Sequence, residues 1–142
     1  MNTNAQSWTL LLGRSLLGLV FLVVGIRSIM LYAGAVGYFA KLGFPIPEAT
    51  TWLAIAIDIA GGILLILGWK TRWISWLLVV FVVIAISAAH RFWEFDASQY
   101  ANQLNHFLKD LAIIGGLLYV ITFGPGAMSV DGRKGGTAPG GA

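Results

Sequence analysis

The sequence predicts an all-α integral membrane protein, a bundle of four transmembrane helices. Of its 142 residues, 58% are hydrophobic and only 11% are charged, whereas soluble domains typically carry about 25% charged residues. The apolar residues fall into four stretches, and each is close to the roughly 20 residues that a helix needs to cross about 30 Å of hydrocarbon. The chain has no cysteine, which excludes disulfides and cysteine-ligated iron–sulfur clusters. No run of basic residues indicates nucleic-acid binding.

A single transmembrane domain is expected over residues 1–123. Its four predicted spans are residues 8–32, 51–69, 73–92 and 103–123. The first connection, residues 33–50, contains glycines, prolines and charges and is expected to be a loop. Residues 124–142 are rich in glycine and include Pro125 and Pro139. This composition predicts a disordered tail.

The distribution of lysine and arginine in the short connections predicts the orientation. With the N-terminus inside, the cytoplasmic side receives Arg14, Lys70, Arg72, Arg133 and Lys134. The opposite connections carry Lys41 and Arg91, with Arg27 and Lys109 nearer the membrane. Both termini are therefore expected in the cytoplasm, and Arg14 is interpreted purely as a topology signal.

Small residues predict where helices approach one another closely, because glycine lets two backbones come into contact. These glycines occur in spans one, two and four, at Gly18, Gly25, Gly61, Gly62, Gly115 and Gly116.

Ionisable and polar residues within the spans are the candidate functional site. With the predicted topology, they fall near the outer third of the bundle: Arg27, Asp58, His90, Gln103, His106, Lys109 and Asp110. A charged group in hydrocarbon costs roughly 2.5–3.5 kcal/mol on insertion scales, so such groups are rarely there without a partner or a function. His106, Lys109 and Asp110 are spaced i, i+3 and i+4 and therefore share one helical face.

Two interpretations of this cluster are open. Arg27 and Lys109 could neutralise Asp58 and Asp110 in a structural ion-pair network that fixes the packing of the helices. The histidines exceed what such pairing needs, and histidine titrates near physiological pH. His90, His106 and Asp58 are therefore the candidate proton-handling groups of a ligand site. A quinone is the candidate ligand, because its apolar tail can lie between helices while polar side chains contact its head group. Haem, a metal site and a covalently bound cofactor are not expected.

Several motifs resemble the DoxX family of small four-helix membrane proteins. They are the run Gly13–Gly25, Asp58-Ile59-Ala60-Gly61-Gly62 followed by a leucine-rich run, His90-Arg91-Phe92-Trp93-Glu94-Phe95, Asn105-His106-Phe107-Leu108-Lys109-Asp110-Leu111, and Gly124-Pro125-Gly126. The resemblance covers roughly residues 10–131, and the order and spacing of the motifs carry it.

The resemblance implies a bacterial or archaeal cytoplasmic-membrane protein related to the membrane subunit of thiosulfate:quinone oxidoreductase. Three positions depart from the family's pattern: Asp58 stands where glutamate is common, Arg27 where lysine is common, and Glu94 in place of asparagine. No thiosulfate site is recognisable in the sequence, so the resemblance does not extend to that substrate.

The leading hypothesis is a membrane subunit of a quinone-linked redox system with a head-group site in the outer third of the bundle. The second is a non-catalytic accessory subunit, docked onto other membrane protein subunits, in which the polar cluster only holds the helices together. A small transporter or lipid-binding module is least favoured, because such sites usually use broken helices and no proline interrupts a predicted span.

Overall fold

The structure is a computed structural model that describes residues 3–89 and 91–135. These residues form seven helical elements: α1 (Thr3–Met30), α2 (Tyr32–Lys41), α3 (Pro47–Leu67), α4 (Thr71–Ala89), the 3-10 helix η1 (Phe92–Glu94), α5 (Ala97–Phe123) and α6 (Val130–Gly135). Within the described residues, four of these, α1, α3, α4 and α5, are long and apolar enough to cross a membrane. The predicted four-helix membrane bundle is confirmed.

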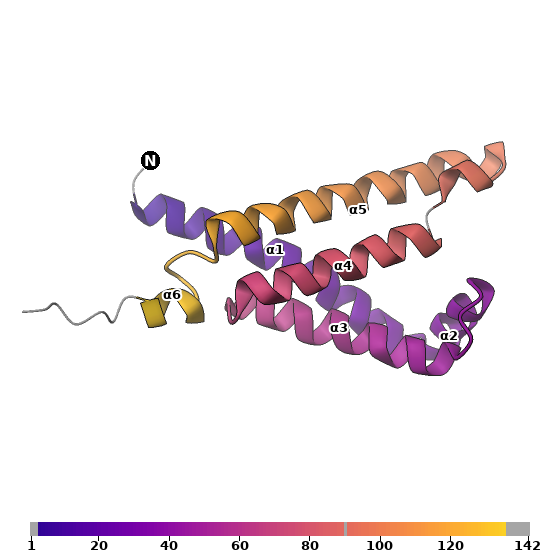
Figure 1. The fold of residues 1–142 in the computed structure, drawn as a ribbon, viewed down its shortest axis with the longest axis horizontal. Coiled ribbons are helices and arrows are strands. Elements are labelled where there is room, and N and C mark those ends of the chain that lie inside the picture. The colour runs from indigo at the N-terminus through magenta and orange to yellow at the C-terminus, as the bar shows by residue number, and fades with distance from the viewer. Residues whose placement is uncertain (1–2, 90, 136–142) are drawn as a thin grey trace, which may run out of the picture.

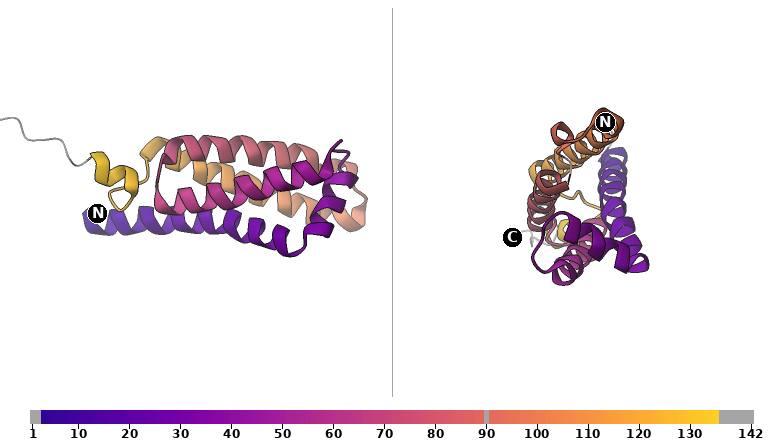
Figure 2. Two further views of the ribbon diagram at one scale, coloured as in Figure 1. Left: turned by 90° about the horizontal axis from the view of Figure 1, so that it is seen from below. Right: turned by 90° about the vertical axis from the view of Figure 1, so that its right-hand side faces the viewer.

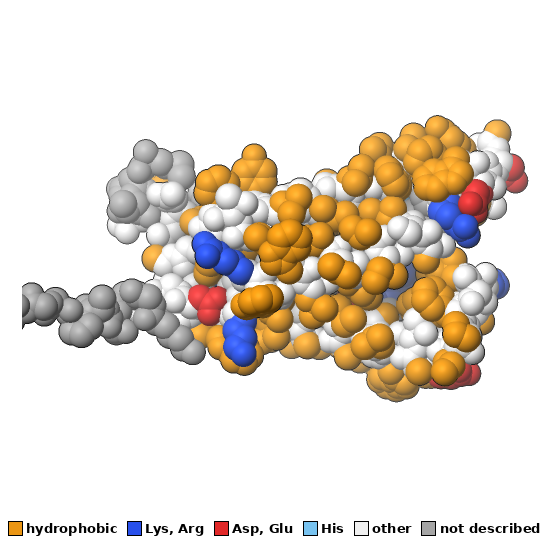
Figure 3. All heavy atoms as spheres, viewed as in Figure 1, with side chains coloured by type: hydrophobic (Ala, Val, Ile, Leu, Met, Phe, Trp, Pro, Cys, Tyr) orange, Lys and Arg blue, Asp and Glu red, His pale blue; other side chains and the backbone are white. Residues whose placement is uncertain are grey.

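The four long helices lie side by side, with α1 packed on α3, α3 on α4, and α4 on α5 (Figures 1 and 2). The start of α1, the α3–α4 turn, the end of α5 and α6 lie at one end of the bundle, which we term the terminal end. The other end carries α2 and η1, and we term it the α2 end. On the face drawn in Figure 3, hydrophobic side chains cover the middle of the bundle and charged side chains gather toward its two ends, as expected of a membrane-spanning surface.

The connection predicted as a loop contains helix α2, which differs from the prediction. The backbone turns at Leu31, where α1 ends, and α2 then packs against α3, with the Tyr32 and Trp52 rings 5.1 Å apart. The glycines of this segment lower its intrinsic helix propensity. Tertiary contact with α3 outweighs that propensity.

Helix α5 begins six residues before the predicted span, at Ala97. The Asp96 carboxylate accepts hydrogen bonds from the backbone N–H groups of Ser98 and Gln99. This is an N-cap, which satisfies backbone donors that have no partner inside the helix. The Ser98 hydroxyl also donates a hydrogen bond to this carboxylate. The hydroxyl hydrogen bond, which has the largest effect, and the two backbone hydrogen bonds lower the pKa of Asp96 below its usual value.

Glycines make the α1–α3 contact unusually close. A Cβ placed on Gly62 would lie 2.7 Å from the Gly18 carbonyl oxygen, and a Cβ on Gly18 would lie 2.7 Å from the Gly62 carbonyl oxygen. Gly25 likewise lies against Ile59. The predicted close approaches are present at these positions, and Gly116 also packs tightly, against Leu17. Gly115 has no such neighbour within 4 Å.

Residues 124–135 do not follow the prediction of a disordered tail, because they fold back onto the α3–α4 turn. The Asp131 carboxylate accepts hydrogen bonds from Lys70 N and from the backbone and hydroxyl of Thr71, at 2.8–2.9 Å. Asp131 thereby caps the start of α4 from a distant part of the chain. Its own N–H donates to the carbonyl oxygen of Gly68. Residues 136–142 of the predicted tail lie outside the described residues.

Arg14, which was expected to act only as a topology signal, also has a structural role, because its side chain is buried, only 2% exposed. Its guanidinium donates to the backbone carbonyl oxygens of Ile66, Pro125 and Met128. Gly68 allows this approach, since its φ of 69° suits glycine and a Cβ there would lie 2.9 Å from the Arg14 guanidinium. Arg14 therefore joins α1, the end of α3 and the C-terminal segment.

Candidate functional site

A cavity of about 660 Å³ lies inside the bundle on the α2 side of its middle. Helices α1 to α5 all contribute to its wall, and most of the lining side chains are apolar. Its ionisable lining residues are Arg27, Tyr38, Asp58, His106 and Asp110. Four of the residues predicted for the site, from three different helices, therefore share one cavity. Whether they bind a ligand stays a prediction.

Asp58 is the most constrained of these residues. It lies midway along α3 and is only 5% exposed. Gly25 brings α1 against it: a Cβ on Gly25 would lie 3.0 Å from the Asp58 Cβ. Among residues 3–89 and 91–135, none donates a hydrogen bond to the Asp58 carboxylate or forms an ion pair with it. A buried polar group normally has a hydrogen-bond partner, whereas Asp58 lines the cavity without one among these residues.

His106 and Asp110 line the opposite wall from α5, where they are half-buried. Their i, i+4 spacing places them on one face of the helix. Arg27 reaches the cavity from near the end of α1 and is exposed on its other side. The cavity therefore combines an arginine and an imidazole with two carboxylates.

The other predicted site residues are placed differently. Lys109 is exposed and is not part of the cavity wall, although it neighbours Asp110 in sequence. Gln103 is half-buried one turn beyond His106 and also lies outside the wall. The spacing of His106, Lys109 and Asp110 indicated one shared helical face. His106 and Asp110 line the cavity, whereas Lys109 turns away from the interior. His90 lies outside the described residues.

Sequence reasoning missed Tyr38, which enters the cavity from α2. Burial raises the pKa of the Tyr38 hydroxyl, and the nearby Asp110 carboxylate raises it further. Tyr38 therefore stays protonated at neutral pH and can donate a hydrogen bond. A signal was present in the sequence: Leu31, Ala35, Tyr38, Phe39 and Leu42 follow the spacing of one apolar helical face. The neighbouring glycines and prolines obscured it.

The cavity opens sideways between α1 and α5. Leu17, Val20, Val24 and Arg27 form one stripe along α1, spaced three or four residues apart, and Leu31 continues it just beyond the end of the helix. At Leu17 this stripe lies against Gly116 of α5. Further along, Val20, Val24 and Leu31 line the cavity but are 42–55% exposed, so α5 no longer covers them. This opening lies on the side of the bundle, between helices long and apolar enough to cross a membrane.

Together, these groups suit a ligand with a small polar head and an apolar body. Arg27 and Tyr38 supply hydrogen-bond donors, Asp58 and Asp110 supply acceptors, and His106 can do either. Among the described residues, no group of three or more histidine, aspartate or glutamate side chains is arranged to hold a metal ion. A quinone fits the donor and acceptor set, because its carbonyl oxygens accept hydrogen bonds and the hydroxyls of its reduced form donate them.

Comparisons with known proteins point to one family. The family model named DoxX matches residues 9–91. The chain is 30% identical over 129 residues to inner membrane protein YphA of Escherichia coli, covering 91% of this chain and 92% of that protein. It is 30% identical over 123 residues to inner membrane protein YqjF of the same organism, covering 85% and 88% respectively.

A more distant similarity extends to eukaryotes. The Surfeit locus protein 4 homolog of Schizosaccharomyces pombe is 29% identical over 133 residues, which cover 92% of this chain but 39% of that protein. No solved structure matches the chain. The family model covers more than half of the sequence, and YphA aligns over nearly its whole length. The chain is a membrane protein and belongs to the DoxX family.

Proposed function

We propose that this protein binds the head group of a quinone in the polar cavity and serves as a membrane subunit of a quinone-linked redox system. The observation that carries the proposal is Asp58, a buried carboxylate that faces the cavity and has no hydrogen-bond donor among the described residues. A hydroxyl of a reduced quinone would supply that donor. The cavity volume of about 660 Å³ falls within the usual range for small-molecule sites, about 300–1,000 Å³.

The sideways opening supports the same ligand class. A quinone carries a long apolar chain, which can extend into lipid through the opening between α1 and α5 while the head group reaches Asp58. His106 and Asp58 would exchange the protons that accompany quinone reduction and oxidation, because both can bind and release a proton. Electrons would come from a partner subunit, which this proposal requires.

Substitution of the cavity carboxylate tests the proposal directly. In the full chain reconstituted in lipid nanodiscs, we expect Asp58→Asn to weaken binding of a ubiquinol analogue, kept in its reduced form, by at least about tenfold, through loss of the hydrogen bond that its hydroxyl donates to the buried carboxylate. His106→Ala should weaken it by a similar factor. Equilibrium binding of the analogue, measured by isothermal titration and corrected with empty nanodiscs, gives the dissociation constants.

Lys109→Ala is the matched control, because Lys109 lies on the same helix next to Asp110 but points away from the cavity. It should bind the analogue like the unsubstituted protein. Equal binding by all three variants would contradict the proposal. If Asp58→Asn and His106→Ala instead lost a stoichiometric membrane partner on purification, without any change in quinone binding, the accessory-subunit alternative would be correct.

We further propose that the protein lies in the cytoplasmic membrane of a bacterium or archaeon with its terminal end inside. The relatives YphA and YqjF are named inner membrane proteins. The terminal end carries Lys70, Arg72 and Arg133, against Lys41 and Arg91 at the α2 end, which is the bias that the positive-inside rule describes.

The absence of native cysteine makes this orientation testable by single-cysteine labelling. In intact cells, a membrane-impermeant maleimide should label Glu48→Cys, at the α2 end, and should leave Arg133→Cys unlabelled until the cells are lysed. The reverse pattern would overturn the orientation.

A further inference from the structure

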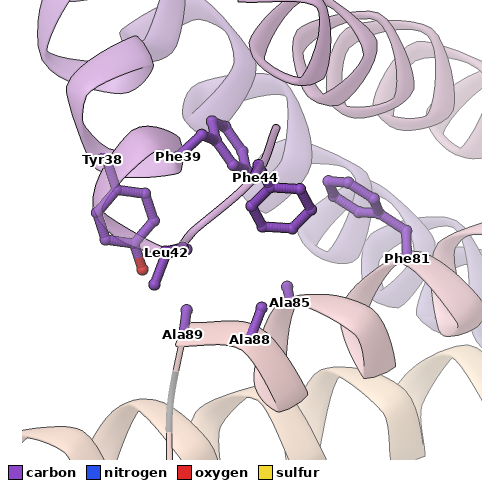
Figure 4. A pocket seen from close by; sticks show the side chains of 8 residues that line it. All are labelled: Tyr38, Phe39, Leu42, Phe44, Phe81, Ala85, Ala88 and Ala89. Carbon is purple, nitrogen blue, oxygen red and sulfur yellow. The ribbon is translucent and has the colours of Figure 1, made fainter. Parts of the chain in front are cut away.

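A smaller apolar chamber of about 180 Å³ adjoins the polar cavity at the α2 end (Figure 4). Ala85, Ala88 and Ala89 form one side of it on α4, and their methyl groups point toward Phe39 and Phe44 on the other side. We term this chamber the annex. Apart from the Tyr38 hydroxyl, its lining side chains carry no polar atom.

The annex and the polar cavity are immediate neighbours. Tyr38, Phe39, Phe81 and Ala85 line both of them. A substituent that reaches the annex from a molecule held at Asp58 would pass these shared side chains. Three small side chains on the annex side of α4, those of Ala85, Ala88 and Ala89, keep the chamber open, because a larger residue at any of them would occupy its volume.

We propose that the annex is a second subsite that receives a compact apolar substituent on the ring of the same ligand whose head group lies at Asp58. This inference rests on the proposed quinone site and adds the shape of its ligand. A dry apolar cavity of about 150 Å³ accommodates benzene, so the annex has room for a fused ring or about one prenyl unit. A longer chain does not fit there and leaves the polar cavity between α1 and α5.

A photoreactive ligand locates the substituent. The probe is 1,4-benzoquinone carrying one prenyl-sized substituent with a diazirine at its end, and the competitor is unsubstituted 1,4-benzoquinone; both are kept in their reduced, hydroquinone form, so that a hydroxyl can donate to Asp58. After illumination of the full chain in nanodiscs, mass spectrometry of peptides identifies the labelled residues. We expect saturable labelling within residues 38–44 and 81–89, removed by the competitor and by Asp58→Asn.

Filling the annex gives a second, independent measurement. Ala88→Phe should weaken binding of the substituted probe by at least about tenfold, because overpacking a small cavity costs about 1–3 kcal/mol. It should leave binding of unsubstituted benzoquinone unchanged, which also verifies that the variant is folded. Ser87→Phe is the matched control, since Ser87 is the adjacent exposed residue and lines neither chamber.

The outcomes separate the annex from the head-group site. Saturable labelling of α1, α5 or lipid, with binding unaffected by Ala88→Phe, would overturn the annex and leave the quinone site intact. Labelling at the annex that neither benzoquinone nor Asp58→Asn reduces would indicate a lipid acyl chain as its occupant, and would also overturn the inference. If unsubstituted benzoquinone does not bind at all, the proposed function itself fails and the inference falls with it.

Discussion

Replacing Arg14 with alanine is expected to lower the free energy of unfolding by about 3–5 kcal/mol, because a buried guanidinium would be lost and three partly buried carbonyl oxygens would lose their charged donor at once. Those oxygens belong to Ile66, Pro125 and Met128, in two segments that the guanidinium holds together. The free energy of unfolding of Arg14→Lys should lie between that of Arg14→Ala and that of the unsubstituted protein, since an ammonium keeps the charge but not the planar fork of donors. Unfolding in mixed detergent micelles, followed by circular dichroism, measures the difference.

Arg133→Ala provides the control for this prediction. Arg133 carries the same charge at the same end of the bundle, but its side chain is exposed. Surface substitutions of this kind usually change stability by less than about 0.5 kcal/mol. Arg14→Ala should also release the C-terminal segment, so trypsin should cleave at Arg133 faster than in the unsubstituted protein. An Arg14→Ala variant as stable as Arg133→Ala would show that the buried hydrogen bonds contribute little.

The second large effect is expected at Gly62, where α1 and α3 are in backbone contact. A methyl group there would lie 2.7 Å from Gly18 O and 2.9 Å from Leu22 N, and backbone atoms cannot move aside as a flexible side chain can. We expect Gly62→Ala to lower the free energy of unfolding by about 1–3 kcal/mol, the usual cost of overpacking. The same micelle titration measures it.

Gly115→Ala and Gly13→Ala are the matched controls, because a Cβ at either glycine meets nothing within 4 Å. Both lie in helices, so alanine should leave stability unchanged or raise it by up to about 1 kcal/mol through its higher helix propensity. If Gly62→Ala behaved like these two variants, the α1–α3 contact would be looser than the structure has it. Because Gly25 holds α1 against Asp58 in the same interface, we also expect Gly62→Ala to weaken quinone binding.

The candidate site was only partly predictable from the sequence. Arg27, Asp58, His106 and Asp110 could be singled out, because charge is costly in hydrocarbon and is therefore conspicuous in an apolar span. Lys109 was grouped with them but does not line the cavity, because helical spacing gives a shared face to within one turn, but not which edge of that face points inward. Tyr38 was not predicted, because an uncharged tyrosine in a segment expected to be a loop does not have the energetic cost of a charge in hydrocarbon.

Arg14 illustrates the same limit at the terminal end. Near the end of a span, an arginine is ordinarily explained by orientation alone, and its sequence neighbours give no hint of partners. Those partners are carbonyl oxygens 52 and 111–114 residues away. Asp131 is comparable, since it caps a helix that starts 60 residues earlier.

By itself the sequence determined the membrane class, the four spans and the family, because these depend on composition, length and local spacing, and each span must satisfy its backbone hydrogen bonds internally. Only the tertiary structure decided which polar side chains share a cavity, that α2 forms part of the cavity wall, and that the C-terminal segment folds back onto the α3–α4 turn. These features depend on contacts between residues far apart in the chain. The local sequence pattern does not predict these contacts, because each helix is stable in the bilayer before it packs against other helices.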